Sequence, residues 1–182
     1  MLNKKNILDK LNNIDDKMLI ARVLDKAVSA EKTRTVTCTD FLDPYQIKLV
    51  ERAMCSVNDI ECRFDGGYSG AERKIAIFEP AHLSNLSKQS AETPLSLINI
   101  ELKRENNITH RDYLGSLMGL GIKREKIGDI IVEGESCSVI VLKEISDYIL
   151  YNLSKVGNTG VIVSKGEIDD LKVPEPKTKE IK

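Results

Sequence analysis

The chain has 182 residues, enough to bury a hydrophobic core as one large domain or two small ones. Charged residues make up 30% and hydrophobic residues 41%, an ordinary globular composition. The 27 lysines and arginines almost balance 28 acidic residues, so the net charge is -1 and no global basic field indicates nucleic acid. Any anionic partner must therefore be bound by a local patch.

The sequence carries no signal for a metal, a cofactor or a membrane. The 4 cysteines are widely spaced without a C-x-x-C pair and there are only 2 histidines, so we expect no metal site. No apolar stretch reaches the roughly 18 residues of a membrane span, and the N-terminus lacks the apolar core of a signal peptide. We therefore expect a cytoplasmic protein without cofactors.

The N-terminal segment predicts helices and then a strand. Apolar residues recur at helical spacing over residues 3–31, with a break near Asn12 and Asn13 that divides them into two helices. Residues 33–39 alternate and are rich in β-branched side chains, which favours a strand.

A second helix signal and a hairpin follow. Asp43 can cap a helix that has Pro44 at its first position and runs to about Ser56. Residues 60–65 and 72–78 are joined by a glycine-rich loop and predict a β-hairpin. Little apolar content follows up to Thr93, so we place a domain boundary there and expect residues 1–93 to form an α+β domain.

From Pro94 the predicted elements follow the order β-α-β-β-α-β. The predicted strands are residues 95–102, 127–132, 136–142 and 160–164, and the predicted helices are residues 109–120 and 144–155. In the second helix Ile145, Tyr148, Ile149 and Leu153 are expected to face inward, and Gly157 to end it. This order predicts a ferredoxin-like, RRM-like domain over residues 94–166, with both helices on one sheet face. The fold class is thus α+β with two small domains, and residues 167–182 are expected to be a linker or tail.

The helix at residues 109–120 has unusual features. Thr109 and Asp112 form a capping-box pattern at its start, and Gly121 suits a left-handed position after its end. Gly115 and Gly119 each cost about 1 kcal/mol relative to alanine. We therefore expect another backbone or a ligand to lie against this glycine face.

Binding of RNA on the sheet is disfavoured because the predicted strands contain no Phe, Tyr or Trp on which bases could stack. Cations instead flank the glycine-bearing helix: Lys103, Arg104, Arg111, Lys123, Arg124 and Lys126, against only Glu105, Asp112 and Glu125. The helix start near His110 and Arg111 adds amides for a phosphate. The alternative is that these are solvated loop residues. They lie near opposite ends of the helix and form one patch only if a long ligand follows its glycine face.

The loop from Gly66 offers a second candidate. Its glycines lie beside Arg73 and Lys74 and could bind phosphate through backbone amides, while Tyr68 could stack on a base. The alternative is a hairpin turn that requires positive φ. The loop lacks the G-K-[ST] ending of a P-loop, and no nucleophile, base and orienting group occur together, so we expect no enzymatic activity.

Three stretches together resemble the YlmH-type S4-domain RNA-binding proteins: residues 41–46, residues 66–74 and, above all, residues 110–130. The resemblance covers nearly the whole chain. It implies an N-terminal α+β domain and a central RRM-like domain that precede an S4 domain, and association with the large ribosomal subunit and tRNA in rescue of stalled translation. The S4 domain would begin where this chain ends, so we expect Lys182 to mark a truncation or a member without that domain.

These observations favour a non-enzymatic, ribosome-associated protein that binds rRNA or tRNA but not DNA. The expected contacts are the basic edge around Arg111 and residues 123–126, with Arg73 and Lys74 contributing. The alternative is a protein interaction module that docks a ribosomal or other protein on the glycine strip or the open sheet face.

Overall fold

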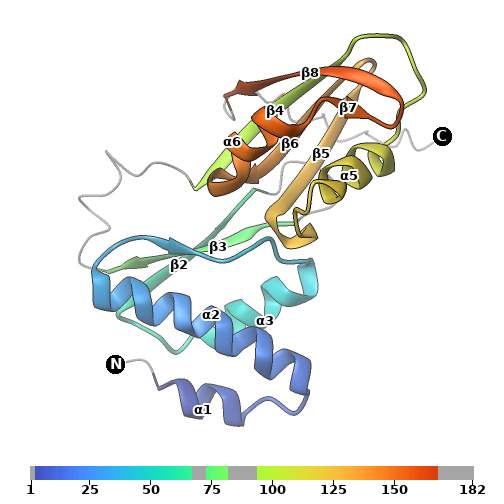
Figure 1. Ribbon diagram of the computed structural model, residues 1–182. Coiled ribbons are helices and arrows are strands. Elements are labelled where there is room, and N and C mark those ends of the chain that lie inside the picture. The colour runs from blue at the N-terminus through green and yellow to red at the C-terminus, as the bar shows by residue number, and fades with distance from the viewer. Residues whose placement is uncertain (1–2, 67–72, 82–93, 168–182) are drawn as a thin grey trace, which may run out of the picture.

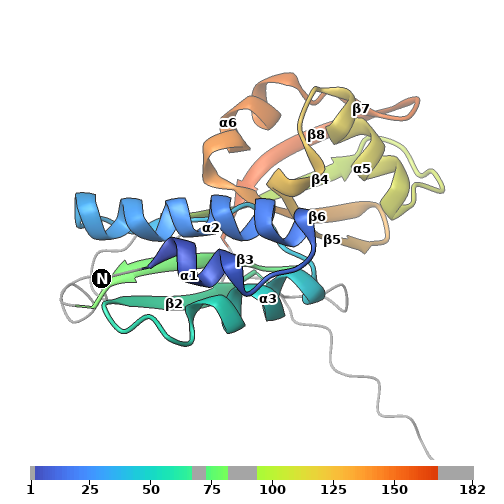
Figure 2. The same cartoon turned by 90° about the horizontal axis from the view of Figure 1, so that it is seen from below.

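The computed structural model describes residues 3–66, 73–81 and 94–167. These residues form two α+β domains, each with one antiparallel sheet that helices cover on one face (Figure 1). In Figure 2 the helices α1, α2 and α3 of the N-terminal domain lie toward the viewer, and the C-terminal domain lies beyond them. Among the described residues, no helix is both long and apolar enough to cross a membrane.

The N-terminal domain packs two helices on a three-stranded sheet of order β1-β3-β2. Its elements are α1 (Lys4–Asp9), α2 (Ile14–Thr33), β1 (Thr37–Cys38), α3 (Pro44–Met54), β2 (Ile60–Asp65) and β3 (Ile75–Pro80). The predicted helix break is confirmed, because Asn13 caps α2 by accepting from the amides of Asp15 and Asp16. The predicted cap of α3 is also confirmed: Asp43 and Gln46 form a capping box, with Pro44 at the first position. The predicted strand 33–39 is wrong at its start, because α2 continues to Thr33 and Arg34 takes a left-handed conformation after it.

The C-terminal domain has the predicted ferredoxin-like arrangement. Its elements are β4 (Leu95–Leu102), α5 (His110–Gly119), the short 3-10 helix η1 (Arg124–Lys126), β5 (Ile127–Glu133), β6 (Ser136–Leu142), α6 (Lys143–Asn152), β7 (Lys155–Val156) and β8 (Thr159–Gly166). The sheet order is β5-β6-β4-β8-β7, and every pair is antiparallel. Alternate residues of β4, such as Ile98 and Ile100, pack under α5 and α6 together with Tyr113, Leu117 and Ile149.

The end of α6 differs from the prediction. The helix stops at Asn152, and residues 155–156 form the edge strand β7, so Gly157 lies in a hairpin turn with a φ of 59°. Tyr148 is also not an inward residue: it is exposed, and its hydroxyl donates to the carbonyl oxygen of Leu120 at 2.7 Å. Tyr148 therefore links the outer surfaces of α6 and α5.

The two sheets meet through the faces that carry no helices. Ala76 and Phe78 of β3 face α2 and α3, whereas Ile75 and Ile77 contact the C-terminal sheet. The apolar cluster at this domain joint comprises Phe41, Ile75, Ile77, Leu95, Leu97, Ile140 and Leu142. Because β3 is covered on both faces, all six of its residues are buried. The predicted boundary near Thr93 and the predicted tail lie largely outside the described residues and stay predictions.

Candidate functional site

The helix-free face of the C-terminal sheet is poorly suited to RNA. Its lower part, around Leu97 and Ile140, is covered by the N-terminal domain. Its upper part consists of two rows of side chains, each of which crosses β5, β6, β4 and β8 in that order. The first row is Ile131, Ser138, Asn99 and Ser164, and the second is Glu133, Ser136, Glu101 and Ile162. These rows contain two carboxylates, no cation and no aromatic ring, so they offer phosphate repulsion and no stacking platform.

The one cation within β4, β5, β6 and β8 is Lys165. Its register partner in β4 is Ile98, which packs under the helices, so Lys165 belongs to the helix-bearing face. There its Nζ lies 2.7 Å from Oδ1 of Asp147 on α6. Cations that could meet a phosphate must therefore lie outside these four strands.

Four of the predicted residues lie together around the start of α5. Lys103 and Arg104 follow β4, while His110 and Arg111 begin the helix, and all four side chains are exposed. Within residues 3–66, 73–81 and 94–167, the cations Lys103, Arg104 and Arg111 form no ion pair. The three positive charges are thus available to solvent.

Lys155 of β7 joins this group, although the sequence pattern predicts helix there. Its register partner is Gly160, whose carbonyl oxygen accepts from the backbone amide of Lys103 at 2.9 Å. A Cβ added to Gly160 would lie 3.2 Å from Cδ of Lys103, so the aliphatic part of Lys103 runs across this glycine. The side chains of Lys103 and Lys155 therefore both lie near Gly160 of β8. The signal for β7 was the Gly157–Asn158 pair between two β-branched residues, which is a two-residue hairpin loop.

A groove runs from this group along α5. It is lined by Arg111, Asp112, Gly115, Ser116, Gly119 and Leu120 of the α5 segment, and by residues 152–155 and Gly157. The prediction that another backbone packs on the glycine face is wrong for the described residues, because a Cβ at Gly115 or Gly119 would meet no atom within 4 Å. The two glycines instead keep the floor of the groove free of side chains.

The carboxylate of Asp112 is occupied at the start of α5. Its Oδ2 accepts from the backbone amide of Thr109 at 2.8 Å and from the Thr109 hydroxyl at 3.1 Å. Part of the repulsion that this carboxylate would exert on a phosphate in the groove is offset by these donors and by the positive end of the helix dipole. The predicted pairing of Thr109 with Asp112 is confirmed.

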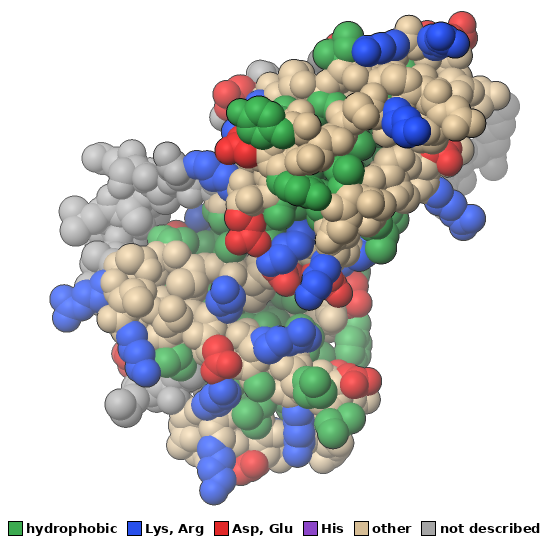
Figure 3. Space-filling model, in the orientation of Figure 1, with side chains coloured by type: hydrophobic (Ala, Val, Ile, Leu, Met, Phe, Trp, Pro, Cys, Tyr) green, Lys and Arg blue, Asp and Glu red, His purple; other side chains and the backbone are tan. Residues whose placement is uncertain are grey.

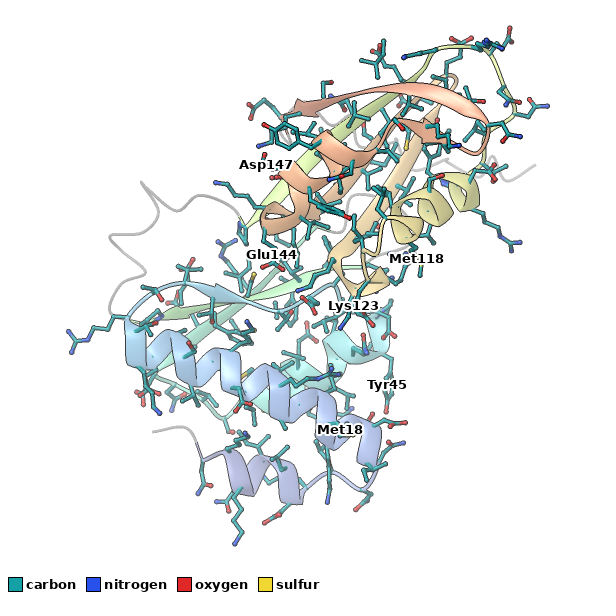
Figure 4. The ribbon with its side chains drawn as sticks, in the orientation of Figure 1. Met18, Tyr45, Met118, Lys123, Glu144 and Asp147 are labelled. Atoms are coloured by element: carbon teal, nitrogen blue, oxygen red, sulfur yellow. The ribbon has the colours of Figure 1, made fainter. Side chains whose placement is uncertain are left out.

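The remaining predicted cations lie at the other end of α5, at the domain joint. Nζ of Lys126 lies 2.7 Å from Oδ1 of Asp40 and 2.8 Å from Oε1 of Glu144, so it joins the two domains. Burial opposes the Lys126 charge, but the hydrogen bonds that Lys126 donates to both carboxylates prevail and raise its pKa. Figure 4 shows Glu144 and Lys123 on the side of the C-terminal domain that faces the N-terminal domain.

Arg124 is also engaged in the structure. Its Nη1 donates to the carbonyl oxygen of Ile127 at 2.7 Å, and burial together with the nearby charge of Arg73 lowers its pKa. Nη2 of Arg73 in turn donates to the carbonyl oxygen of Phe41 at 3.4 Å. The two guanidinium groups thus lie near each other, and each donates a hydrogen bond to a backbone carbonyl oxygen.

Two further predicted residues lie near the joint, and one is outside the described ranges. Lys123 is exposed and forms no ion pair among the described residues. Lys74 is half-buried, with its backbone paired to Leu42. Tyr68 lies outside the described residues.

The predicted cations thus form two groups and not one continuous edge. The ten residues of α5 span about 15 Å at a rise of 1.5 Å per residue, and they separate the two groups. Figure 3 shows Lys and Arg side chains at the far end of the C-terminal domain and a second set between the domains, and acidic side chains accompany both sets. We name Lys103, Arg104, Arg111 and Lys155 the distal cation group.

The described residues contain no arrangement typical of an enzyme. No three His, Cys, Asp or Glu side chains in residues 3–66, 73–81 and 94–167 could hold a metal ion. His110 lies on the exposed first turn of α5, and within the same ranges it forms no hydrogen bond to a nucleophile. The arrangement of charges can bind an anion, and it offers no group positioned for covalent chemistry.

Two known proteins are similar to most of this chain. A curated relative, the "Ribosome-associated protein quality control protein P2" of Bacillus subtilis (strain 168), is 30% identical over 161 residues; the match covers 88% of this chain and 61% of the relative. A solved structure, the "Cell division protein ylmH from Streptococcus pneumoniae", matches 88% of this chain and 96% of its own with a TM-score of 0.71 and 19% identity, which shows the shared fold.

Two family models describe the domains in turn. Residues 15–81 match the N-terminal domain of YlmH, and residues 89–170 match the putative RNA-binding domain in YlmH. The two matched ranges contain the strands, the helices that follow α1, the domain joint and the distal cation group described above, apart from the first residue of α2. The chain therefore belongs to the YlmH family.

Proposed function

We propose that this chain is a non-enzymatic, ribosome-associated RNA-binding protein, and that the distal cation group is where it contacts RNA. One contrast carries the proposal. The four main strands of the RRM-like domain hold a single cation, which Asp147 neutralises. The distal group instead presents four exposed cations, and two of them, Arg111 and Lys155, line one groove. Phosphate is therefore attracted to the helical side of this domain and repelled from its sheet.

The proposed mechanism is recognition of the ribose-phosphate backbone. A strand that enters between Lys103 and Arg111 can follow the groove, because Gly115 and Gly119 let it approach the helix backbone. Neutralisation of phosphates releases counterions, so binding falls steeply with salt concentration. Contacts of this kind fix position and shape and do not read bases.

The joint cations have a different role in this proposal. Lys126 joins the two domains and Arg124 is hydrogen-bonded to the carbonyl oxygen of Ile127, so only the exposed Lys123 and the nearby Arg73 and Lys74 remain to extend the contact. A long RNA could reach both ends of α5. Tyr68 stays a candidate for stacking.

The names of the relatives support a ribosomal setting for the proposed RNA contact. One relative is named as a ribosome-associated quality control protein, and the matched domain is described as a putative RNA-binding domain. Because this chain spans only 61% of that relative, we extend its association to this chain as a proposal. We propose rRNA or tRNA as the ligand, the large ribosomal subunit as a further partner, rescue of stalled translation as the process and the cytoplasm as the location.

Titration against salt tests the site. Fluorescence anisotropy of labelled tRNA and of a labelled single-stranded rRNA fragment is measured at KCl concentrations from about 50 to about 300 mM. Over this range the screening of interactions between charges goes from weak to strong. The test variant combines Lys103→Ala, Arg111→Ala and Lys155→Ala. The control combines Lys5→Ala, Lys10→Ala and Lys32→Ala, three exposed cations of the N-terminal domain, and changes net charge equally.

The expected results separate a site from a general charge effect. The test variant loses about tenfold or more in affinity. Its slope of log K against log salt becomes shallower by about 2, because each phosphate that is no longer neutralised on single-stranded RNA reduces the slope by roughly 0.7. The control variant keeps the slope. Equal losses of affinity in both variants would overturn the assignment of the distal cation group.

A further inference from the structure

The N-terminal domain carries an exposed apolar patch. The patch is surrounded by acidic side chains, in contrast to the basic distal cation group. Ile14 and Met18 lie one turn apart on α2 and are 73% and 60% exposed, and Tyr45 at the second position of α3 is 60% exposed. Met18 and Tyr45 line one hollow together with Leu19. Figure 4 shows Met18 and Tyr45 at the same end of this domain. We call Ile14, Met18, Leu19 and Tyr45 the α2–α3 patch.

The patch is held in place by polar contacts. The Tyr45 hydroxyl donates to Oδ2 of Asp16 at 2.8 Å, which ties the start of α3 to the first turn of α2. This hydrogen bond is the main cause that raises the pKa of Tyr45. The caps Asn13 and Asp43 fix the two helix starts. A partner would therefore meet a surface that is already ordered, which reduces the entropic cost of binding.

The rim of the hollow is acidic. Asp15, Asp16 and Asp43 line it against the single cation Arg22, so three carboxylates face one guanidinium. The helix amides that could attract an anion are already used, because Asn13 accepts from the amides of Asp15 and Asp16 and Asp43 accepts from that of Gln46. RNA and anionic lipid are both repelled here.

We infer that the α2–α3 patch docks a basic protein segment in which lysines and arginines flank apolar side chains. The apolar side chains would cover Ile14 and Met18, and the cations would meet the carboxylates of the rim. A lysine or arginine could also lie on the exposed ring of Tyr45, since aromatic faces attract cations. Clustered exposed apolar side chains within a polar rim are typical of protein interaction sites.

The test uses three synthetic peptides of twelve residues, an arbitrary length of roughly three helical turns. The first alternates Lys or Arg with Leu, the second replaces Leu by Ser, and the third replaces the cations by Glu. Each is titrated into the whole chain while NMR follows the methyl groups of Ile14 and Met18 and the ring of Tyr45. We expect the first peptide to shift these signals and to bind about tenfold or more tighter than the other two.

Two variants separate the apolar and the charged contributions. Ile14→Ser with Met18→Ser removes exposed apolar groups, and we expect about a tenfold loss of affinity for the first peptide without loss of folding. Asp15→Asn with Asp43→Asn removes two charges while asparagine keeps the cap, and we expect a weaker and less salt-dependent interaction. The triple variant of the distal cation group is the matched control and keeps peptide binding. The two patch variants in turn keep tRNA binding, so this inference and the proposed RNA site fail independently.

Several results would overturn the inference. These are equal binding of the acidic peptide, signal changes away from the patch, displacement of the peptide by tRNA, and no binding of any peptide at millimolar concentration. Sedimentation velocity gives one further outcome: a dimer that Ile14→Ser with Met18→Ser abolishes would assign the patch to a second copy of this chain.

Discussion

The ring of Phe41 occupies the space that a side chain at position 128 would need. A Cβ added to Gly128 would lie 2.5 Å from Cε1 and Cζ of Phe41 and 3.0 Å from the carbonyl oxygen of Ile140. The backbone amide of Phe41 also donates to the carbonyl oxygen of Glu125 at 2.7 Å. One residue of the N-terminal domain is thus inserted into the start of β5, and it fixes how the two domains sit together.

Gly128→Ala should therefore destabilise the protein by about 1–3 kcal/mol, because the added methyl group overpacks a buried contact. Urea unfolding measures the change. Phe41→Leu in the Gly128→Ala background should restore part of the stability, and a double-mutant cycle gives the coupling energy. A Gly128→Ala protein as stable as the parent would contradict the contact.

Gly115 gives the opposite expectation. Because a Cβ there meets nothing among the described residues, Gly115→Ala should stabilise the protein by about 0.5–1 kcal/mol. Gly121→Ala is the matched control and should destabilise it, since Gly121 has a φ of 91°. Thermal unfolding of the two variants measures both effects.

Gly115→Leu tests the groove itself. Leucine is a good helix former, so stability should again rise, but its side chain fills the floor of the groove. We expect at least about a threefold loss of tRNA affinity, or roughly 0.6 kcal/mol. A variant that is more stable and binds less cannot be explained by misfolding, whereas unchanged affinity would exclude the groove as the path of the RNA.

Local signals explain which elements could be predicted from the sequence. Periodicity and caps locate α2, α3, β4, α5 and β6 within about two residues, since each signal acts over one or two turns or strands. The pair Thr109 and Asp112 is three residues apart and forms as expected. The order of these elements is enough to indicate the ferredoxin-like domain.

The domain joint could not be predicted, because it depends on residues far apart in the chain. The local sequence presents Lys126 as a free cation, yet its partner Asp40 is 86 residues away. Likewise, no local signal relates Phe41 to Gly128. Tyr148 fits the inward stripe of α6 by spacing, but the structure turns its hydroxyl toward Leu120 on the surface. The spacing of apolar residues predicts which face of a helix is apolar. It does not predict which element packs against that face.

Lys126 gives a prediction with a defined pH dependence. Lys126→Met should cost about 0.5–1.5 kcal/mol, because both ion pairs are partly exposed and such pairs contribute little each. The hydrogen bonds with Asp40 and Glu144 raise the Lys126 pKa above 10.5, so the contribution is fully present below that value and disappears as pH rises through the folded pKa. Urea unfolding of parent and variant at pH 7 and in alkaline buffer should show the difference shrink. A difference that grows with pH would contradict the assignment.

The rates at which the cysteine thiols are alkylated measure how readily the domain joint opens. Burial raises the pKa of the Cys137 thiol to about 12, and burial also raises that of Cys38, which packs against the joint, whereas Cys55 is exposed. Thiolate is the reactive form, so iodoacetamide at pH 8 should label Cys55 first and Cys137 last, as peptide mass spectrometry can follow.

If Phe41 holds the joint, Gly128→Ala should speed the labelling of Cys38 about tenfold, the factor expected when about 1.4 kcal/mol is removed from the opening free energy. Cys137 lies in the separate core under α5 and α6, so its labelling should change less. Equal acceleration at both thiols would mean that the two domains open as one cooperative unit and that the joint has no local opening of its own.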